Sequence, residues 1–385
     1  MKIVYALLII CSGYVVRAQN KLPVVHAHSK SARIYEEDNS VSRWNIDPKI
    51  KNDVYTTGKL IKPKLVKFKT DIDSISVVVK PGSHQNFVVL LNGKDSCFTR
   101  IQSPENKNFS KLKPAIHDSI PFYVNIYNTN LVHVVVNKTD SLVLNFDTGA
   151  TEVSLTTDAL EKKVKSKPQL YSKFLDIQLG KHVYQSKVYD TQMVGNEADG
   201  LLGWDVFDGM IVELNYDKNL FVVHSKMPES IRANPHFSKF KIRYMNNKPF
   251  IETAVTQDGI VNKDWFLFDL GYQSTVMLDN DLLASAHFPS AQMKVIKKVI
   301  LHGTQGNEVP VITASLDRLQ LGAFHLENVP AQLLTQNKPM PGKNIHILGN
   351  EILKRFNTFL DFQKNIIYLM PNALYNLEYK SATKS

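Results

Sequence analysis

The strongest constraint on this chain is an internal repeat, in which four short features occur twice in the same order. The first copy consists of LVLNFDTGATEVSL, IQLG, GLLGWDVF and VELNYDKNLFVV. The second copy consists of WFLFDLGYQSTVML, LQLG, HILGNEIL and TFLDFQKNIIYL. One matching triplet would carry little weight, whereas a fixed order of four features argues for a duplicated structural unit.

The spacing between the copies locates their main difference. Asp147 and Asp269 are 122 residues apart, whereas Gly180 and Gly322, which end the two QLG features, are 142 apart. The second copy therefore carries 20 additional residues between its aspartate and its LQLG feature.

Each copy places an aspartate directly after an apolar run that is typical of a strand. The DTG triplet alone is more typical of a turn, because aspartate and glycine are common where strands turn. Its counterpart in the second copy favours a catalytic pair instead. Two carboxylates within a few ångströms of each other cannot both ionise, so they share one proton. One is then a base that activates water, and the other is an acid that stabilises the oxyanion. We therefore predict that Asp147 and Asp269 are catalytic.

Four glycines support this interpretation. Gly149 and Gly271 lack Cβ atoms, which lets the two aspartate loops approach closely. The apolar runs that end at Gly203 and Gly349 are expected to pack behind those loops.

The segment FDTGA, followed by a hydrophobic strand, a QLG strand and LLG before a helix, resembles the aspartic peptidases, particularly the retropepsin-like kind of bacterial secreted proteins. The resemblance covers about 121–375. It implies a mainly β, bilobal fold, with one catalytic aspartate from each of two barrel-like lobes and neither metal nor organic cofactor. It also implies that Thr148 fixes its loop by a hydroxyl. The family carries Thr or Ser in both triplets, so Leu270 is a departure that removes half of the cross-loop hydrogen bonds.

The 20 additional residues of the second copy predict a flap. VIKKVILHGTQGNEVPVITASL has two β-type runs around a glycine-containing turn, and the family closes such a hairpin over its substrate to exclude water. The candidate flap residues are His302, Gly303, Thr304, Gln305, Gly306 and Asn307. The alternative is a surface hairpin without substrate contact.

The remaining organisation follows from composition and pattern. Residues 1–18 have the lysine, apolar run and V-x-A ending of a signal peptide cut after Ala18, which predicts a secreted or periplasmic protein. Cleavage leaves Cys97 as a lone core cysteine, and no later apolar run reaches the roughly 18 residues of a membrane span. The other expected segments are a β-rich accessory region at 19–116, lobe 1 at 117–226, lobe 2 at 238–378 and a disordered tail at 379–385.

The net charge of +10 raises the question of a nucleic-acid partner. Part of this charge lies at 59–71, where Lys67 and Lys69 alternate with apolar residues, as on a strand with one face in water. We interpret this segment as an edge strand that its lysines protect from aggregation. A nucleic-acid groove would interleave arginines with exposed aromatics, so we predict no nucleic-acid partner.

Two functions remain, because the motifs of serine hydrolases, zinc peptidases and nucleotide-binding loops are absent from the sequence. The first is an aspartic endopeptidase acting on a peptide or protein, for which a monomer suffices because one chain carries both aspartates. The alternative is a non-catalytic binding protein of the same fold, which Leu270 favours.

Overall fold

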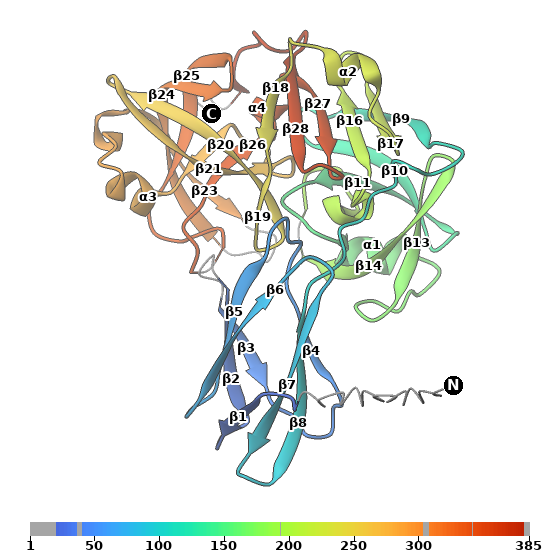
Figure 1. The fold of residues 1–385 in the computed structure, drawn as a ribbon. Helices are drawn as coiled ribbons and strands as arrows, with labels where there is room; N and C mark the ends of the chain where they lie inside the picture. Colours follow the sequence, from blue (N-terminus) through green and yellow to red (C-terminus); the bar gives the residue numbers. More distant parts are fainter. Residues whose placement is uncertain (1–20, 37–40, 193, 303–307, 341, 381–385) are drawn as a thin grey trace, which may run out of the picture. The chain divides into compact units, whose positions relative to one another are not determined.

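The computed structural model describes residues 21–36, 41–192, 194–302, 308–340 and 342–380, and it is mainly β (Figure 1). The described chain divides into two compact units. The first contains the residues up to Thr57 together with Pro63–Ser103, and the second contains Gly58–Lys62 and the residues from Pro104 onward. The predicted signal segment at 1–18, with its cut after Ala18, lies outside the described residues. No helix in the described ranges is both long and apolar enough to span a membrane.

The first unit ends earlier than the predicted boundary at 116. Residues 104–116 belong to the second unit because their backbone bonds there: the Phe109 N–H donates to the Gly209 carbonyl at 3.0 Å, and the Ile116 N–H donates to Ser225 Oγ at 2.9 Å. No sequence pattern marks such contacts, since both partners lie about 100 residues away.

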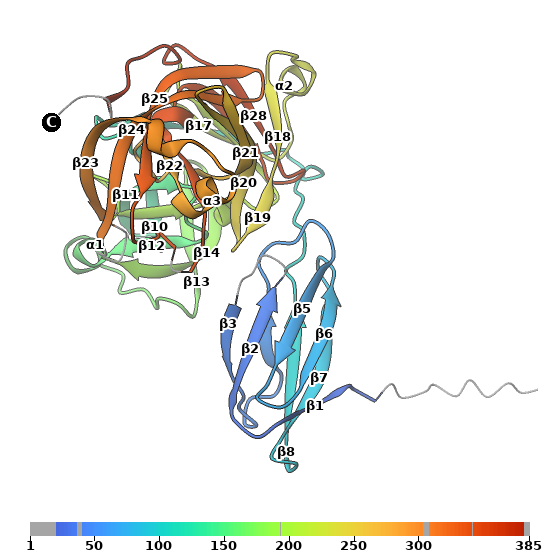
Figure 2. The ribbon, with the colours of Figure 1, turned by 90° about the vertical axis from the view of Figure 1, so that its left-hand side faces the viewer.

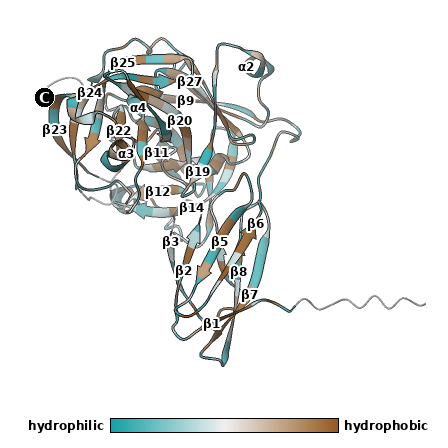
Figure 3. Cartoon of the chain, turned by 60° about the vertical axis from the view of Figure 1, so that its left-hand side comes forward, coloured by the Kyte–Doolittle hydropathy of each residue, from teal (hydrophilic) through white to brown (hydrophobic). Residues whose placement is uncertain are grey.

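The first unit contains two sheets with alternating hydrophobic and hydrophilic residues along their strands (Figure 3). Phe68 and Phe87, one from each sheet, are fully buried and join the sheets with ring centroids 5.1 Å apart. Cys97 is buried on an inward-facing position, as predicted. The strand order in the first sheet is β1 (Val24–Ala27), β7 (His84–Leu91), β8 (Asp95–Gln102) and β4 (Asp53–Thr56). The strand order in the second sheet is β3 (Val41–Asn45), β2 (Ser31–Glu36), β5 (Lys64–Lys69) and β6 (Ser74–Val79).

The prediction that the segment 59–71 forms an edge strand is wrong. Strand β5 pairs with β2 on one side and with β6 on the other, so that Lys69 faces Arg33 and Lys67 faces Ser76. The predicted alternation is present, because Lys67 and Lys69 are exposed while Val66 and Phe68, which alternate with them, are buried. Alternation reports which face of a strand meets water but not where the strand lies in its sheet.

The second unit contains two lobes, many of whose strands are labelled in Figure 2. The two lobes repeat one pattern of strand pairing. In lobe 1 the strands are β10 (Asn130–Val136), β11 (Asp140–Asp147), β12 (Val153–Thr156), β13 (Phe174–Leu179), β14 (His182–Thr191) and β15 (Gly200–Gly203). Their counterparts in lobe 2 are β20 (Lys248–Gln257), β21 (Ile260–Asp269), β22 (Val276–Leu278), β24 (Glu308–Leu321), β25 (Phe324–Leu334) and β26 (His346–Gly349). Both lobes are barrel-like.

The pairings of the two lobes correspond strand by strand. The first two strands pair antiparallel, the aspartate strand pairs parallel with the strand that ends in glycine, and the short third strand pairs parallel with the fifth. The first and fourth strands also pair antiparallel in both lobes. Because the sequence features and the pairings agree, the repeated pattern is a property of the backbone as well as of the sequence.

Short helices follow matching strands. Helix α1 (Thr157–Lys162) follows β12, and α3 (Asn280–Ser285) follows β22. A cap side chain begins each of them: the hydroxyl of Thr156 and the carboxylate of Asp279 accept from backbone N–H groups. The 3₁₀ helix η1 (Trp204–Phe207) follows β15, and α4 (Asn350–Leu353) follows β26. Two further short helices are α2 (Glu229–Ala233) and η2 (Ser290–Gln292).

Six strands form a layer that joins the lobes. Their order is β9 (His117–Val124), β17 (Leu220–His224), β16 (Ile211–Asn215), β27 (Phe356–Asp361), β28 (Ile366–Pro371) and β18 (Ser238–Lys241). The pairing of β16 with β27 sets Ile211 beside Asp361 and Leu214 beside Thr358, so backbone hydrogen bonds hold lobe 1 to lobe 2. The short strand β19 (Arg243–Met245) leads into β20.

The 20 additional residues of the second copy lie where the spacing predicts. They include strand β23 (Lys294–His302), which makes a hairpin with the first part of β24 and pairs Leu301 with Val309. In lobe 1 the matching stretch, 163–173, forms no strand. The hairpin tip, 303–307, lies outside the described residues.

The predicted disordered tail begins too early. Tyr379 packs its ring under the guanidinium of Arg355, 4.3 Å from the ring centroid, and Lys380 Nζ donates to the Ile126 carbonyl at 2.8 Å. These contacts extend the folded chain to Lys380. Residues 381–385 lie outside the described part of the chain.

Candidate active site

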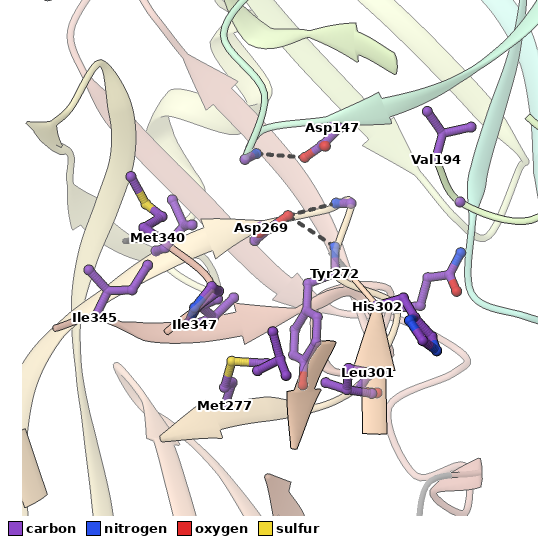
Figure 4. Close-up of a pocket in the computed structure, with 18 of the residues that line it drawn as sticks. Asp147, Val194, Asp269, Tyr272, Met277, Leu301, His302, Met340, Ile345 and Ile347 are labelled. Carbon is purple, nitrogen blue, oxygen red and sulfur yellow. Dashed lines mark hydrogen bonds between the residues drawn. The ribbon is translucent and has the colours of Figure 1, made fainter. Parts of the chain in front are cut away.

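The two aspartates occupy equivalent positions at the ends of equivalent strands. Asp147 ends β11, where parallel pairing sets it beside Gly203 of β15. Asp269 ends β21, where the same pairing sets it beside Gly349 of β26. The two aspartates lie near each other at one cavity (Figure 4). The fold therefore brings together the two carboxylates that the sequence predicts as a pair.

Each aspartate lies against the glycine of the opposite loop. A Cβ atom added to Gly149 would come within 2.6 Å of Asp269 Oδ2, and one added to Gly271 would come within 2.3 Å of Asp147 Cγ. Real Cβ atoms do not approach other atoms so closely. The contact between the loops thus depends on the absence of side chains at both positions, as expected from the sequence.

Backbone donors orient the two carboxylates, as the dashed lines of Figure 4 mark. The Gly149 N–H donates to Asp147 Oδ1 at 2.6 Å. The N–H groups of Gly271 and Tyr272 donate to Asp269 Oδ1 at 2.9 and 3.0 Å. Both acids are held by their own loops, and Asp269 receives one donor more.

The hydroxyl of Thr148 links the two loops. It donates to the Phe268 carbonyl and accepts from the Leu270 N–H at 3.1 Å. Leu270 occupies the matching position, is fully buried, and packs its side chain into the core. One half of the cross-loop hydroxyl network is therefore present and the other half is replaced by apolar packing.

The hydroxyl of Thr275, which follows Leu270, does not substitute for the missing one, because it donates to the Pro330 carbonyl of its own lobe.

Two polar side chains that no sequence motif marks, Gln273 and Lys248, bridge the lobes here. Gln273 Nε2 donates to Thr129 Oγ1 at 2.7 Å, while the Gln273 backbone carbonyl accepts from Asn128 Nδ2 at 2.8 Å. Lys248, at the start of β20, donates from Nζ to the Gly149 carbonyl. The loop of Asp269 is thus tied to lobe 1 without a hydroxyl at position 270.

Gly203 and Gly349 lie directly behind the aspartate loops. A Cβ atom on Gly203 would come within 2.3 Å of the Thr151 carbonyl oxygen, and one on Gly349 would come within 2.3 Å of the Ser274 carbonyl oxygen. The predicted packing of these residues behind the loops is present in both lobes.

The electrostatics of the pair are asymmetric. Burial raises the pKa of Asp269 well above its usual range, and the charge of the neighbouring Asp147 raises it further. The ammonium of Lys248 and the Tyr272 N–H act in the opposite direction. Asp269 therefore keeps a proton at a pH where an exposed aspartate has lost it.

The aspartates lie at the wall of a cavity of about 540 Å³, which is a common size for a ligand pocket. Apolar side chains form much of the remaining wall (Figure 4), including Leu267, Met277, Ile345 and Ile347. The β23–β24 hairpin adds Ile300, Leu301, His302 and Val309. Of the candidate flap residues, His302 lines the cavity, and the other five lie outside the described residues.

Within the described ranges, no group of three or more His, Cys, Asp or Glu side chains is arranged to hold a metal ion. A comparison of the sequence with models of known protein families gives no match. A comparison with curated proteins gives no match either. The function is therefore inferred from the geometry and chemistry of the site itself.

Proposed function

We propose that the protein is an aspartic endopeptidase that hydrolyses peptide bonds in peptide or protein substrates. One observation carries the proposal: the carboxylate of each aspartate lies against the glycine of the opposite loop, at the wall of a cavity of ligand size. The two lobes are then the halves of an aspartic-protease fold, and one chain suffices for the site. The sequence pattern of 1–18 supports secretion or a periplasmic location.

In the proposed reaction, Asp269 carries the shared proton, because its pKa is raised by burial and by Asp147. Asp147 accepts a proton from water as the water oxygen bonds to the substrate carbonyl carbon, and Asp269 donates its proton to the carbonyl oxygen. As the intermediate collapses, the proton on Asp147 passes to the leaving nitrogen and the C–N bond breaks. A hydroxyl proton of the intermediate returns to Asp269, which restores the pair.

The cavity wall supports a hydrophobic substrate side chain beside the scissile bond. Leu267, Met277 and Ile347 lie around the second aspartate, and an apolar side chain of the substrate would replace water there. The β23–β24 hairpin is the proposed flap, because its described end lines the same cavity as the aspartates. Closure of the β23–β24 hairpin over a bound substrate would exclude water during the reaction.

The second candidate function is a peptide-binding protein without catalysis. The observation that favours it is Leu270, which removes a cross-loop hydroxyl. A small displacement of a catalytic group can cost about 100-fold in rate. The bonds from Thr148, Gln273 and Lys248 favour the endopeptidase, since they fix both loops without that hydroxyl.

The deciding experiment incubates the protein lacking residues 1–18 with a mixed peptide library from about pH 3 to pH 8. Asp147→Asn and Asp269→Asn variants are run beside it, and products are identified by mass spectrometry. Cleavage by the wild-type protein and its loss in both variants support the endopeptidase. Cleavage that survives in either variant contradicts the catalytic pair. Peptide binding without cleavage by a folded protein supports the binding protein.

A further inference from the structure

Lys248 is a cation on the wall of the proposed catalytic cavity. It lies at the first position of β20, in lobe 2, and lines the cavity together with Asp147 and Asp269. Its side chain is half-buried, and its Nζ crosses to lobe 1 to donate to the Gly149 carbonyl. The ammonium is therefore held beside the site where the peptide bond would be cleaved.

The ammonium of Lys248 has donors to spare. It can donate three hydrogen bonds, and within the described part of the chain one is made, to a neutral carbonyl. The charge of Lys248 acts on Asp269, whose pKa it lowers, but no described carboxylate forms a close ion pair with its Nζ, in contrast to Lys59 and Lys338, whose Nζ atoms lie 2.5 and 2.6 Å from aspartate oxygens. A half-buried charge is stabilised by an opposite charge with good geometry, and a ligand in the cavity can supply one.

The remaining wall indicates what else such a ligand carries. Met277, Ile345 and Ile347 are apolar and line the same cavity, so they suit a hydrophobic side chain rather than a second charge. A peptide that combines a hydrophobic side chain with a nearby carboxylate satisfies both parts of the wall.

We propose that Lys248 is a specificity-determining residue, whose ammonium binds the carboxylate of a glutamate or aspartate side chain close to the scissile bond. The inference rests on the proposed peptidase function, because it concerns the substrate of that site. A charge-assisted hydrogen bond in a partly buried site corresponds to a preference of about tenfold to 100-fold for the acidic residue over its amide.

The test uses octapeptides with a central Phe-Leu pair. Each peptide carries one Glu, Gln or Lys at one of the positions that flank the pair, two on each side. We expect the wild-type protein to cleave one of the Glu peptides about tenfold to 100-fold better in kcat/KM than the matched Gln peptide, mainly through KM. Lys248→Met should abolish this ratio, and Lys248→Arg should retain part of it. Lys248→Glu should favour the Lys peptide instead. Equal cleavage of Glu and Gln peptides at every position, or a ratio unchanged in Lys248→Met, would overturn the proposal.

A binding assay separates this inference from the proposed function. Fluorescein-labelled peptides of the same series, each with a free or an amidated C-terminus, are titrated into Asp147→Asn, with and without Lys248→Met, and anisotropy is followed. Tighter binding of a Glu peptide that depends on Lys248 supports the inference even if the wild-type protein cleaves nothing. Cleavage by the wild-type protein without any Glu preference in either assay rejects the inference and leaves the peptidase standing. If binding depends on a free C-terminus and not on the Glu side chain, the proposal that Lys248 binds a side-chain carboxylate is wrong.

Folding controls keep these outcomes interpretable. Lys248→Gln is a second uncharged variant that keeps a hydrogen-bond donor for the Gly149 carbonyl, so it removes the charge with less disturbance of the loop. We expect its thermal midpoint to match that of the wild-type protein. If Lys248→Gln folds and keeps the full Glu preference, the proposal is wrong even where Lys248→Met fails to fold.

Discussion

The two lobes of the second unit share a backbone plan but differ in the side chains that complete the site. Lobe 1 supplies the hydroxyl of Thr148, which reaches across to the other loop. Lobe 2 has Leu270 at that position and adds the β23–β24 hairpin and Lys248. The repeated framework thus brings two carboxylates together, while the differences divide the supporting tasks between the lobes. Substitutions in the two lobes therefore test whether the two aspartates contribute equally to activity although their surroundings differ.

The largest expected effect is on the aspartates themselves. Asp147→Asn and Asp269→Asn should each lower kcat/KM by about 100-fold to 10,000-fold, because each removes a group that transfers a proton in the proposed reaction. Peptide cleavage by the two variants is compared at one pH with equal amounts of folded protein. If either Asp147→Asn or Asp269→Asn keeps wild-type activity, the two lobes are not equivalent and the pair of aspartates is not the catalytic unit.

The next effect concerns the hydroxyl of lobe 1. Thr148→Val removes both cross-loop bonds and leaves the buried Leu270 N–H without its acceptor. We expect a loss of about 1–3 kcal/mol in the free energy of unfolding and a fall in kcat of roughly tenfold to 100-fold from displaced carboxylates. Denaturant titration and steady-state kinetics measure the two quantities.

The control for that prediction is Thr139→Val. Thr139 is exposed in the turn between β10 and β11, and its hydroxyl makes long bonds of 3.4 Å to the Asn137 carbonyl and to Asp140 Oδ1, so its replacement should change stability by less than about 0.5 kcal/mol. Equal behaviour of the two variants would mean that the cross-loop hydroxyl of Thr148 contributes nothing.

A third comparison installs the missing hydroxyl in lobe 2. The Thr and Val side chains have nearly the same shape, so Leu270→Thr and Leu270→Val lose the same packing. The difference between the two variants in stability and kcat therefore isolates the effect of the hydroxyl. If the lobes are as alike as their strand pairing, the new hydroxyl reaches the Phe146 carbonyl in the way that Thr148 reaches Phe268. We then expect the Thr variant to be at least as stable as the Val variant and to have the higher kcat. A Thr variant less stable by about 1–3 kcal/mol would show an unpartnered hydroxyl and a real difference between the loops.

The smallest effect is a shift in pH dependence. The titratable side chains that line the cavity are Asp147, Asp269, Lys248, Tyr272 and His302. The charge of Lys248 lowers the pKa of Asp269, so Lys248→Met should raise it. In the proposed reaction Asp269 is the acid, so the alkaline limb of kcat/KM should move to higher pH.

The control for this shift is Lys263→Met, which removes an exposed lysine that pairs with Glu252. It should leave the pH profile unchanged. An alkaline limb that moves to lower pH in Lys248→Met, or that moves equally in both variants, would contradict the assigned influence of Lys248.

The comparison of sequence with structure separates two kinds of information. The mainly β fold, the repeat and the position of the extra hairpin were predictable, because a fixed order of strand-like features survives in the sequence. The contact of Gly149 and Gly271 with the opposite aspartates was predictable from the missing Cβ atoms. These features all depend on residues close to each aspartate in the sequence.

What the sequence could not predict depends on distant partners. Lys248 carries no motif, and its role appears when β20 of one lobe reaches Gly149 of the other. The internal position of β5 was missed because alternation does not report neighbours in a sheet. The boundary at Ser103 was missed because Phe109 bonds to Gly209, 100 residues later. Each of these is a long-range contact without a local signal.

The central claim is that the two carboxylates share a proton held by Asp269, and a stability titration tests it without a substrate. Because the pKa of Asp269 is raised in the folded state, its contribution to stability is present at low pH and is lost as pH rises toward the folded pKa. Denaturant unfolding of the wild-type protein and of Asp269→Asn is therefore measured from about pH 3 to pH 8. We predict that the variant gains stability relative to the wild-type protein above about pH 4, by up to about 1.4 kcal/mol for each pH unit. A difference between the two proteins that stays constant over this range would contradict the shared proton.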